Sequence, residues 1–211
     1  MKFWKLASAI MAFILSTTVN AAIIDNDTYT TDTVSGLDWL DLTETTNMSY
    51  NDIATQLNVG GALEGWRYAT ESEIIGFFDA FGGDNNYYDG WSTQNNGLFD
   101  KVSLVWGDTY CNMSHVSCEL GDGYSLFLYD GNYSSDIYAT EGLIFDRNGY
   151  TDQPDYDWVV VSQSYISRDI AYTDHGSALV REVSSVPVPA AIWMFSSGLI
   201  GLVGLARCKK A

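Results

Sequence analysis

Two segments rich in acids and amides offer the oxygens that a calcium ion needs. The first, GGDNNYYDG, carries Asp84 and Asp89, and the second, TDQPDYDW, carries Asp152, Asp155 and Asp157. Calcium takes about six to eight oxygen ligands from flexible loops. Neither segment follows the EF-hand pattern, and exposed carboxylates are also satisfied by water or sodium. The five aspartates are therefore calcium candidates, with ordinary solvated loops as the alternative.

Aromatic residues stand among the polar loops of the same region. They are Tyr87, Tyr88, Trp91, Tyr110, Tyr124, Tyr129, Tyr133, Tyr138 and Tyr150. Tyr and Trp offer flat apolar faces with a polar edge, which suit pyranose rings and equally suit sheet faces and interfaces. The cluster of Tyr87, Tyr88 and Trp91 is the candidate glycan platform, and packing in the core or on a sheet is the alternative.

Residues for catalysis form no recognisable pattern in the sequence. His115 and His175 are the only histidines, and no Gly-x-Ser-x-Gly, phosphate-binding glycine loop or His-Glu-x-x-His occurs. A carboxylate pair for glycoside cleavage could be present among so many acids, but a solvated acidic surface explains them equally well. We therefore expect no enzymatic activity, with a secreted enzyme acting on surface polysaccharide as the alternative.

Cys111 and Cys118 are separated by six residues that include His115. A disulfide between them would close a small loop in an oxidising compartment. The spacing Cys-x3-His-x2-Cys also offers three metal ligands, but no fourth ligand is spaced nearby. We expect the disulfide, and calcium is the only cofactor that the sequence suggests.

The N-terminal residues 1–21 have the pattern of a secretory signal peptide. Lys2 and Lys5 precede an apolar run over residues 6–15, and small residues, Val19 and Ala21, stand before the expected cleavage point. The run is shorter than the ~20 residues of a membrane span, which disfavours an uncleaved anchor. We therefore expect export of everything that follows residue 21.

The C-terminal residues combine three features in a fixed order. The first is a proline-containing tetrapeptide, Val186, Pro187, Val188 and Pro189. The second is an uncharged stretch, 190–206, and the third is a basic end with Arg207, Lys209 and Lys210. The stretch would span about 26 Å as a helix, enough for a thin bilayer, and the cations would hold its end in the cytoplasm. An ordinary membrane anchor would share the last two features.

This three-part tail resembles the PEP-CTERM sorting signal, with Val188 at the position where the family usually has glutamate. The resemblance implies that an exosortase, a membrane-embedded cysteine protease, cuts near the prolines. It also implies a Gram-negative bacterium that makes exopolysaccharide, with the product released or attached outside the cell. The partners it implies are the exosortase, the secretion machinery and, before processing, the inner membrane.

Charge is concentrated between the two ends. The chain has 10 Lys and Arg and 27 Asp and Glu, a net charge of −17. Five of the cations lie in the two ends, so residues 22–189 hold five cations against all 27 acids, a net charge of −22. Nucleic acid is excluded as a partner because phosphates require clustered cations. Acidic polysaccharide is disfavoured unless a divalent cation bridges it to the protein.

The region between the ends predicts one α+β domain, 22–183, followed by a linker and the sorting segment, 184–211. Capping-box spacing at Ser49 and Thr70, followed by apolar residues at helical intervals, predicts two helices that end at paired glycines. Short apolar runs bounded by turn residues predict an antiparallel sheet. The runs are 23–24, 37–42, 102–106, 124–129, 142–145, 158–161 and 177–183.

Three fragments of this domain also stand in a familiar order: Gly36-Leu37-x-Trp39-Leu40, GWRYATESEI over 65–74, and Leu179-Val180-Arg181. The order is similar to that of bacterial Lcl C-terminal domains, with Tyr68-Ala69 in place of the family's Leu-Pro. The resemblance implies a C-type-lectin-like fold. We expect Trp66 in the core and Arg67 paired with an acid or carbonyls at the start of the second helix, with substrate contact by Arg67 as the alternative.

These observations predict an exported, exosortase-processed protein of the cell envelope or extracellular matrix. Its acidic domain would bind a glycan, such as the producer's exopolysaccharide, or another envelope component. The alternatives are the polysaccharide-degrading enzyme and a purely structural surface protein.

Overall fold

The computed structural model describes residues 23–84, 90–91, 94–109, 123–131, 134–146 and 157–183. The chain divides into two compact units, Met1–Arg181 and Glu182–Ala211, and nearly all the described residues belong to the first. The predicted signal peptide, the Cys111–Cys118 pair and the sorting segment lie outside the described residues. Within the described residues, no helix has the length and apolar character needed to span a membrane.

The first sheet joins the two ends of the domain. Its strands, in spatial order, are β1 (Ile23–Asp25), β2 (Tyr29–Asp32), β3 (Leu37–Leu40), β10 (Leu179–Glu182) and β4 (Arg67–Tyr68). The β2–β3 turn contains Gly36, whose left-handed φ of 72° glycine adopts without strain. Strand β10 therefore lies next to β3, although the two are far apart in the sequence.

The second sheet contains the long strands of the middle of the chain. Its spatial order is β5 (Gly90–Trp91), β8 (Asp157–Ser167), β7 (Tyr138–Asp146), β6 (Gly123–Tyr129) and β9 (His175–Ser177). Neighbouring strands of this sheet pair antiparallel, except for β6 and β9, which are parallel. The final strand that the sequence predicts over 177–183 is present as β10, but it begins only at Leu179. Ser177 belongs to β9, and the chain passes from the second sheet to the first at Ala178.

Three α-helices and a short 3-10 helix are described: α2 (Tyr50–Gln56), α3 (Glu71–Ala80), α4 (Leu98–Trp106) and η1 (Leu42–Thr45). Both predicted capping boxes are present, at Ser49 and Thr70. The predicted strand at 102–106 is wrong, because these residues belong to α4. Its buried residues Leu98, Phe99, Val102 and Trp106 follow helical rather than alternating spacing.

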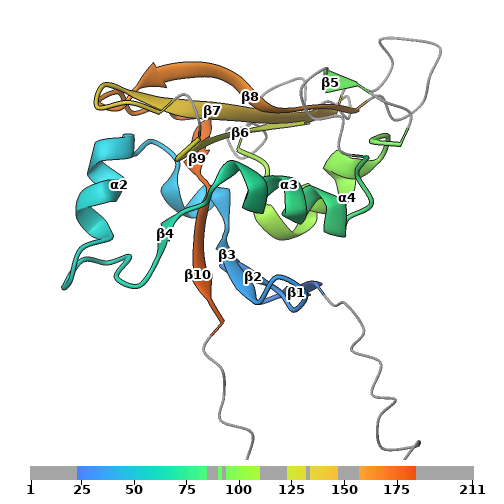
Figure 1. Ribbon diagram of the computed structural model, residues 1–211, viewed down its shortest axis with the longest axis horizontal. Helices are drawn as coiled ribbons and strands as arrows, with labels where there is room; N and C mark the ends of the chain where they lie inside the picture. The colour runs from blue at the N-terminus through green and yellow to red at the C-terminus, as the bar shows by residue number, and fades with distance from the viewer. Residues whose placement is uncertain are drawn as a thin grey trace, which may run out of the picture. The chain divides into compact units, whose positions relative to one another are not determined.

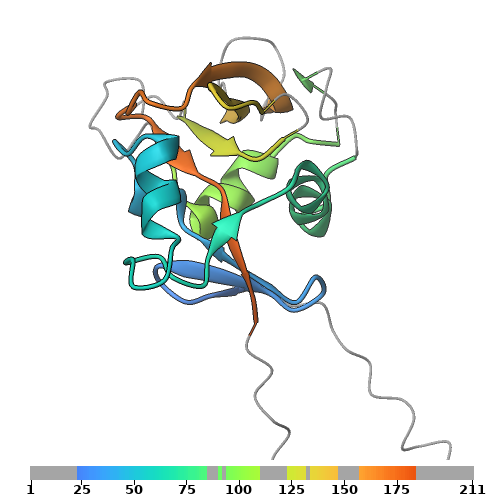
Figure 2. The same cartoon turned by 60° about the vertical axis from the view of Figure 1, so that its left-hand side comes forward.

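The core lies between the sheets, around the helices (Figure 1; Figure 2 shows it turned). Trp39 stacks on Phe77 with ring centroids 4.4 Å apart and meets Trp106 edge-on at 5.7 Å. A smaller cluster beside α2 contains Tyr50, Ile53 and Leu179, and Trp66 packs against it while only partly buried. The α+β class predicted from the sequence is confirmed. Within the described residues there are two sheets where one was expected, and three α-helices where two were expected.

Candidate functional site

The two acidic segments start from neighbouring points of the second sheet. Strand β5 pairs with the first residues of β8, so that Trp91 lies opposite Trp158 and Gly90 opposite Val159. On the other side of the first segment, the Asp84 amide donates to Asn95 Oδ1 at 3.2 Å. Residues 90–91 of the 84–96 segment therefore lie next to Trp158, at the end of the 150–158 segment. Tyr87, Tyr88, Asp89, Asp152 and Asp155 lie outside the described residues, and only the backbone of Trp91 is described.

Asp157, one of the calcium candidates, has a structural partner. Its carboxylate is only 1% exposed, and its Oδ2 accepts a hydrogen bond from the Phe99 amide at 2.6 Å. The residue at the N-cap of α4 is Gly97, which has no side chain to cap the helix. A carboxylate is favourable at a helix N-terminus, so Asp157 supplies the cap from a distant strand. In the part of the chain that the structure describes, no three Asp, Glu, His or Cys residues are grouped for metal binding.

Two exposed tyrosines form the aromatic surface that the structure describes best. Tyr138, at the start of β7, is 45% exposed, and Tyr165, near the end of β8, is 59% exposed. Their ring centroids are 6.3 Å apart and their planes are inclined by 55°. We call these two residues the tyrosine pair. A third exposed aromatic residue, Trp158, is 40% exposed at the opposite end of β8.

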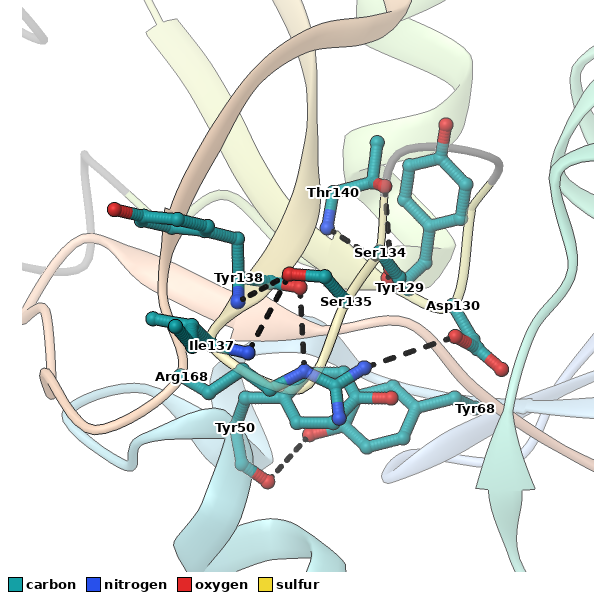
Figure 3. A network of polar contacts seen from close by, with 10 residues as sticks. All are labelled: Tyr50, Tyr68, Tyr129, Asp130, Ser134, Ser135, Ile137, Tyr138, Thr140 and Arg168. Carbon is teal, nitrogen blue, oxygen red and sulfur yellow. Dashed lines mark hydrogen bonds and ion pairs between the residues drawn. The ribbon is translucent and has the colours of Figure 1, made fainter.

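The backbone of Tyr138 is held by Arg168, which follows β8 (Figure 3). The Arg168 amide donates to the Ile137 carbonyl at 2.9 Å, and its Nε donates to the Tyr138 carbonyl at 3.2 Å. The guanidinium lies over the Tyr50 ring at 4.2 Å and is 3.9 Å from the Asp130 carboxylate. A cation against an aromatic face is stabilising, so Arg168 connects the second sheet to helix α2.

Behind Arg168 the Tyr50 and Tyr68 rings stack almost parallel, with centroids 3.9 Å apart (Figure 3). The Tyr68 hydroxyl donates to the Tyr50 carbonyl at 3.0 Å. Burial raises the pKa of Tyr50 to about 12 and that of Tyr68 further still. Both phenols therefore stay protonated at any physiological pH, so the two stacked rings beneath Arg168 carry no charge.

The Arg67 prediction is confirmed at the start of α3. Its guanidinium forms two hydrogen bonds with Glu73, at 2.6 and 2.9 Å, and a third with the Tyr68 carbonyl at 3.1 Å. The Arg67 hydrogen bonds, reinforced by Thr70, hold the pKa of Glu73 at about 2 despite the opposing effect of burial. Glu73 is the capping-box acid of α3, so Arg67 fixes the start of that helix.

The sequence fragments 36–40, 65–74 and 179–181 contribute the neighbouring strands β3, β4 and β10 of the first sheet. Arg181, on β10, donates from Nε to Asp38 Oδ2 at 2.9 Å. Its guanidinium lies over the Trp66 ring at 4.3 Å and over the Tyr29 ring at 4.7 Å. Each fragment thus contributes to one set of contacts: Asp38 from the first, Trp66 from the second and Arg181 from the third.

His175 lies between two carboxylates, of which Asp174 is its neighbour in the sequence; the sequence does not indicate the second, Glu141, because it comes from a different strand, β7. Nδ1 lies 2.8 Å from Asp174 Oδ1, and Nε2 lies 3.5 Å from Glu141 Oε2. Burial alone would lower the pKa of His175, but the bonds to Glu141 and Asp174 outweigh burial and raise it. His175 and Glu141 are both buried. The cluster is therefore suited to joining β9 to β7, not to contacting a large substrate.

No protein family, curated protein or solved structure matches this chain.

Proposed function

We propose that this chain is an exported envelope or matrix protein whose domain binds glycan without cleaving it. The observation that carries the binding proposal is the tyrosine pair, two exposed rings on neighbouring strands with centroids 6.3 Å apart. Aromatic rings of this kind give large contact area for little loss of side-chain entropy. A sheet that is already ordered adds preorganisation, because binding then costs less conformational freedom.

The charge of the exported region bears on the class of glycan. At −22, it repels acidic polymers, so a neutral polysaccharide is the favoured ligand. An acidic polysaccharide would require a bridging cation, and calcium bound by the 84–96 and 150–158 segments would supply it. The pairing of β5 with β8 supports this version, because it holds the bases of the two segments together.

The proposed localisation of the protein rests on the sequences of its two ends. The signal-peptide pattern and the PEP-CTERM-like tail support export, anchoring in the inner membrane through 190–206, and release or surface attachment after exosortase cleavage near Pro187 and Pro189. The contacts among Asp38, Trp66 and Arg181 support the C-type-lectin-like assignment, because residues of all three resembling fragments meet.

The binding proposal is tested by replacing the tyrosine pair. Each ring contributes about 0.5–1.5 kcal/mol, so Tyr138→Ala with Tyr165→Ala should weaken retention on the producer's exopolysaccharide by about tenfold or more. Leu104→Ala is the control, because Leu104 is 79% exposed and lies on helix α4, not on the strands that carry the tyrosine pair. Co-sedimentation of the full chain, purified in mild detergent, gives the affinities.

Unchanged retention by the double variant would exclude the tyrosine pair as the binding surface. In that case a loss caused by Trp91→Ala or Trp158→Ala would move the site to the β5–β8 end. The same assay in EDTA separates the two glycan classes: retention of a neutral polysaccharide should persist, whereas calcium-bridged retention of an acidic one should disappear.

A further inference from the structure

The Arg181 guanidinium in the first sheet is fixed from three sides. Tyr29 and Trp66 flank it at 4.7 and 4.3 Å, with their own rings 6.3 Å apart in an edge-to-face arrangement. Asp38 accepts from its Nε at 2.9 Å, and Thr31 Oγ1 in turn donates to the other Asp38 oxygen at 2.6 Å. The guanidinium plane is therefore positioned before any ligand arrives.

The outer edge of the Arg181 guanidinium remains available to a ligand. The Arg181 side chain is 36% exposed, and within the described residues only its Nε forms a hydrogen bond. A guanidinium whose Nε is occupied still presents two terminal amino groups in a rigid, planar fork. Tyr29 and Trp66 are themselves only partly buried, so apolar ring surface borders this fork.

The electrostatics favour an uncharged ligand at this fork. Asp38 is 6% exposed and neutralises Arg181, so the pair presents hydrogen-bond donors without a net positive charge. The surrounding domain is strongly acidic, which disfavours a carboxylate or phosphate. Vicinal hydroxyls of a neutral sugar fit a planar pair of donors, and the apolar face of a pyranose fits the neighbouring rings.

We propose that Tyr29, Trp66 and Arg181 form a second saccharide-binding site, separate from the tyrosine pair. This inference rests on the proposed glycan-binding function and extends it. The first sheet carries this site and the second sheet carries the tyrosine pair, with helices α3 and α4 between the sheets (Figure 1). A domain with one saccharide site on each sheet is bivalent, so it cross-links polysaccharide chains and gains avidity from two contacts.

The test uses the full chain in mild detergent, labelled with 5-fluorotryptophan, and oligosaccharides prepared from the producer's exopolysaccharide. The Trp66 fluorine signal is assigned from Trp66→Phe. We expect this signal to shift saturably during the titration, and to shift equally in the Tyr138→Ala, Tyr165→Ala variant. Arg181→Lys keeps the charge but lacks the fork, so the Trp66 titration should weaken by about tenfold, as expected for losing one charge-assisted hydrogen bond.

Arg67→Lys is the matched control, since it makes the same substitution at a neighbouring arginine of the first sheet that contacts Glu73 instead. Circular dichroism of each variant establishes that the fold is retained. A second readout is cross-linking: the wild type should raise the viscosity of a polysaccharide solution, whereas Arg181→Lys should bind through the tyrosine pair without raising it.

The outcomes separate this inference from the proposed function. If the tyrosine pair binds polysaccharide but the Trp66 fluorine signal does not shift, the second site is refuted and the proposed function stands. If neither site responds and no polysaccharide is retained, both are refuted. A Trp66 shift that is unchanged in Arg181→Lys would refute the role of the fork.

Discussion

Asp41 carries a charge that the fold does not compensate. It stands between β3 and η1, where its backbone amide donates to the Thr28 carbonyl at 3.1 Å, while its side chain forms no capping hydrogen bond. Its Oδ1 atom is buried and has no hydrogen-bond partner among the described residues. Burial, and then the nearby carboxylates Asp25, Glu44 and Asp27, raise the pKa of Asp41 to about 7. We therefore predict that Asp41→Asn stabilises the protein above neutral pH.

The magnitude follows from linkage between ionisation and folding. The Asp41 carboxyl titrates near 3.8 when unfolded and near 7 when folded, so stability is highest below the first value and falls until the second. The shift of about 3 units sets a ceiling of about 4 kcal/mol at ~1.36 kcal/mol per unit. The side chain is only partly buried, and solvent screening reduces this, so we expect Asp41→Asn to add about 1–2 kcal/mol at pH 8.

Urea unfolding of both proteins at pH 4 and at pH 8 gives the measurement. The gain should be near zero at the lower pH, where the aspartic acid is largely neutral like asparagine, and full at the higher one. Asp38→Asn is the matched control, because the Asp38 carboxylate is buried against Arg181 and should cost about 1.5–3 kcal/mol when neutralised. A gain from Asp41→Asn that did not change with pH, or a loss at pH 8, would refute the reasoning.

Three further predictions concern stability. The interactions that raise the pKa of His175 stabilise the fold fully below about pH 6.5, and this contribution is lost as the pH rises through the pKa of His175 in the folded state. The melting temperature of the wild type should therefore fall over this pH range, and that of His175→Gln should not. Glu73, with a pKa of about 2, contributes above pH 4.5 and loses its contribution as pH falls, so Glu73→Gln should cost about 1–2 kcal/mol at pH 7 by urea unfolding, after allowance for partial exposure. Gly176→Ala would place a Cβ 2.4 Å from the Leu42 carbonyl oxygen and should cost about 1–3 kcal/mol of stability. A Cβ at Gly76, inside α3, would meet no atom within 4 Å, so Gly76→Ala should stabilise the protein by about 0.5–1 kcal/mol. Equal effects of the two substitutions on urea unfolding would contradict the close contact at Gly176.

The parts of the fold that the sequence predicts correctly are those set by local interactions. Helices α2 and α3 begin at capping boxes, in which both partners lie within four residues. The sequence predicts a strand over 102–106, inside α4, because the apolar and β-branched residues there resemble one. The acid that caps α4, Asp157, lies 58 residues after Phe99 and gives no local signal of a helix. The crossing between the sheets at Ala178 is also fixed by residues distant in the sequence. The Ala178 amide donates to the Leu128 carbonyl, and the Ala178 carbonyl accepts from the Ala69 amide.

The candidate site was only partly predictable for a related reason. Tyr138 is among the aromatic residues that the sequence singles out, but Tyr165 is not, because it stands within 158–167, a stretch without charged residues where a core position is the default. The register of β7 with β8 brings the two together, and a register is not readable from one strand alone. Tyr129, also singled out, proves to be fully buried in the core.

The few cations of the domain are used mainly inside the protein. Arg67 contacts Glu73, Arg168 stacks on Tyr50, and Arg181 pairs with Asp38. A net charge of −22 in residues 22–189 is therefore accompanied by little free positive charge on the described surface. This distribution agrees with a ligand that is neutral or bridged by a cation, and it explains why single arginine substitutions should affect stability as well as binding.

The central claim, binding without cleavage, is tested most directly by one incubation of the full chain with the producer's purified exopolysaccharide, followed by co-sedimentation and a reducing-end assay over time. We predict that the protein is retained on the polysaccharide and that the concentration of soluble reducing ends stays at the level of a protein-free control. A steady release of soluble sugar would show an enzyme instead. Absence of retention, with and without calcium, would contradict glycan binding and leave the protein a structural role.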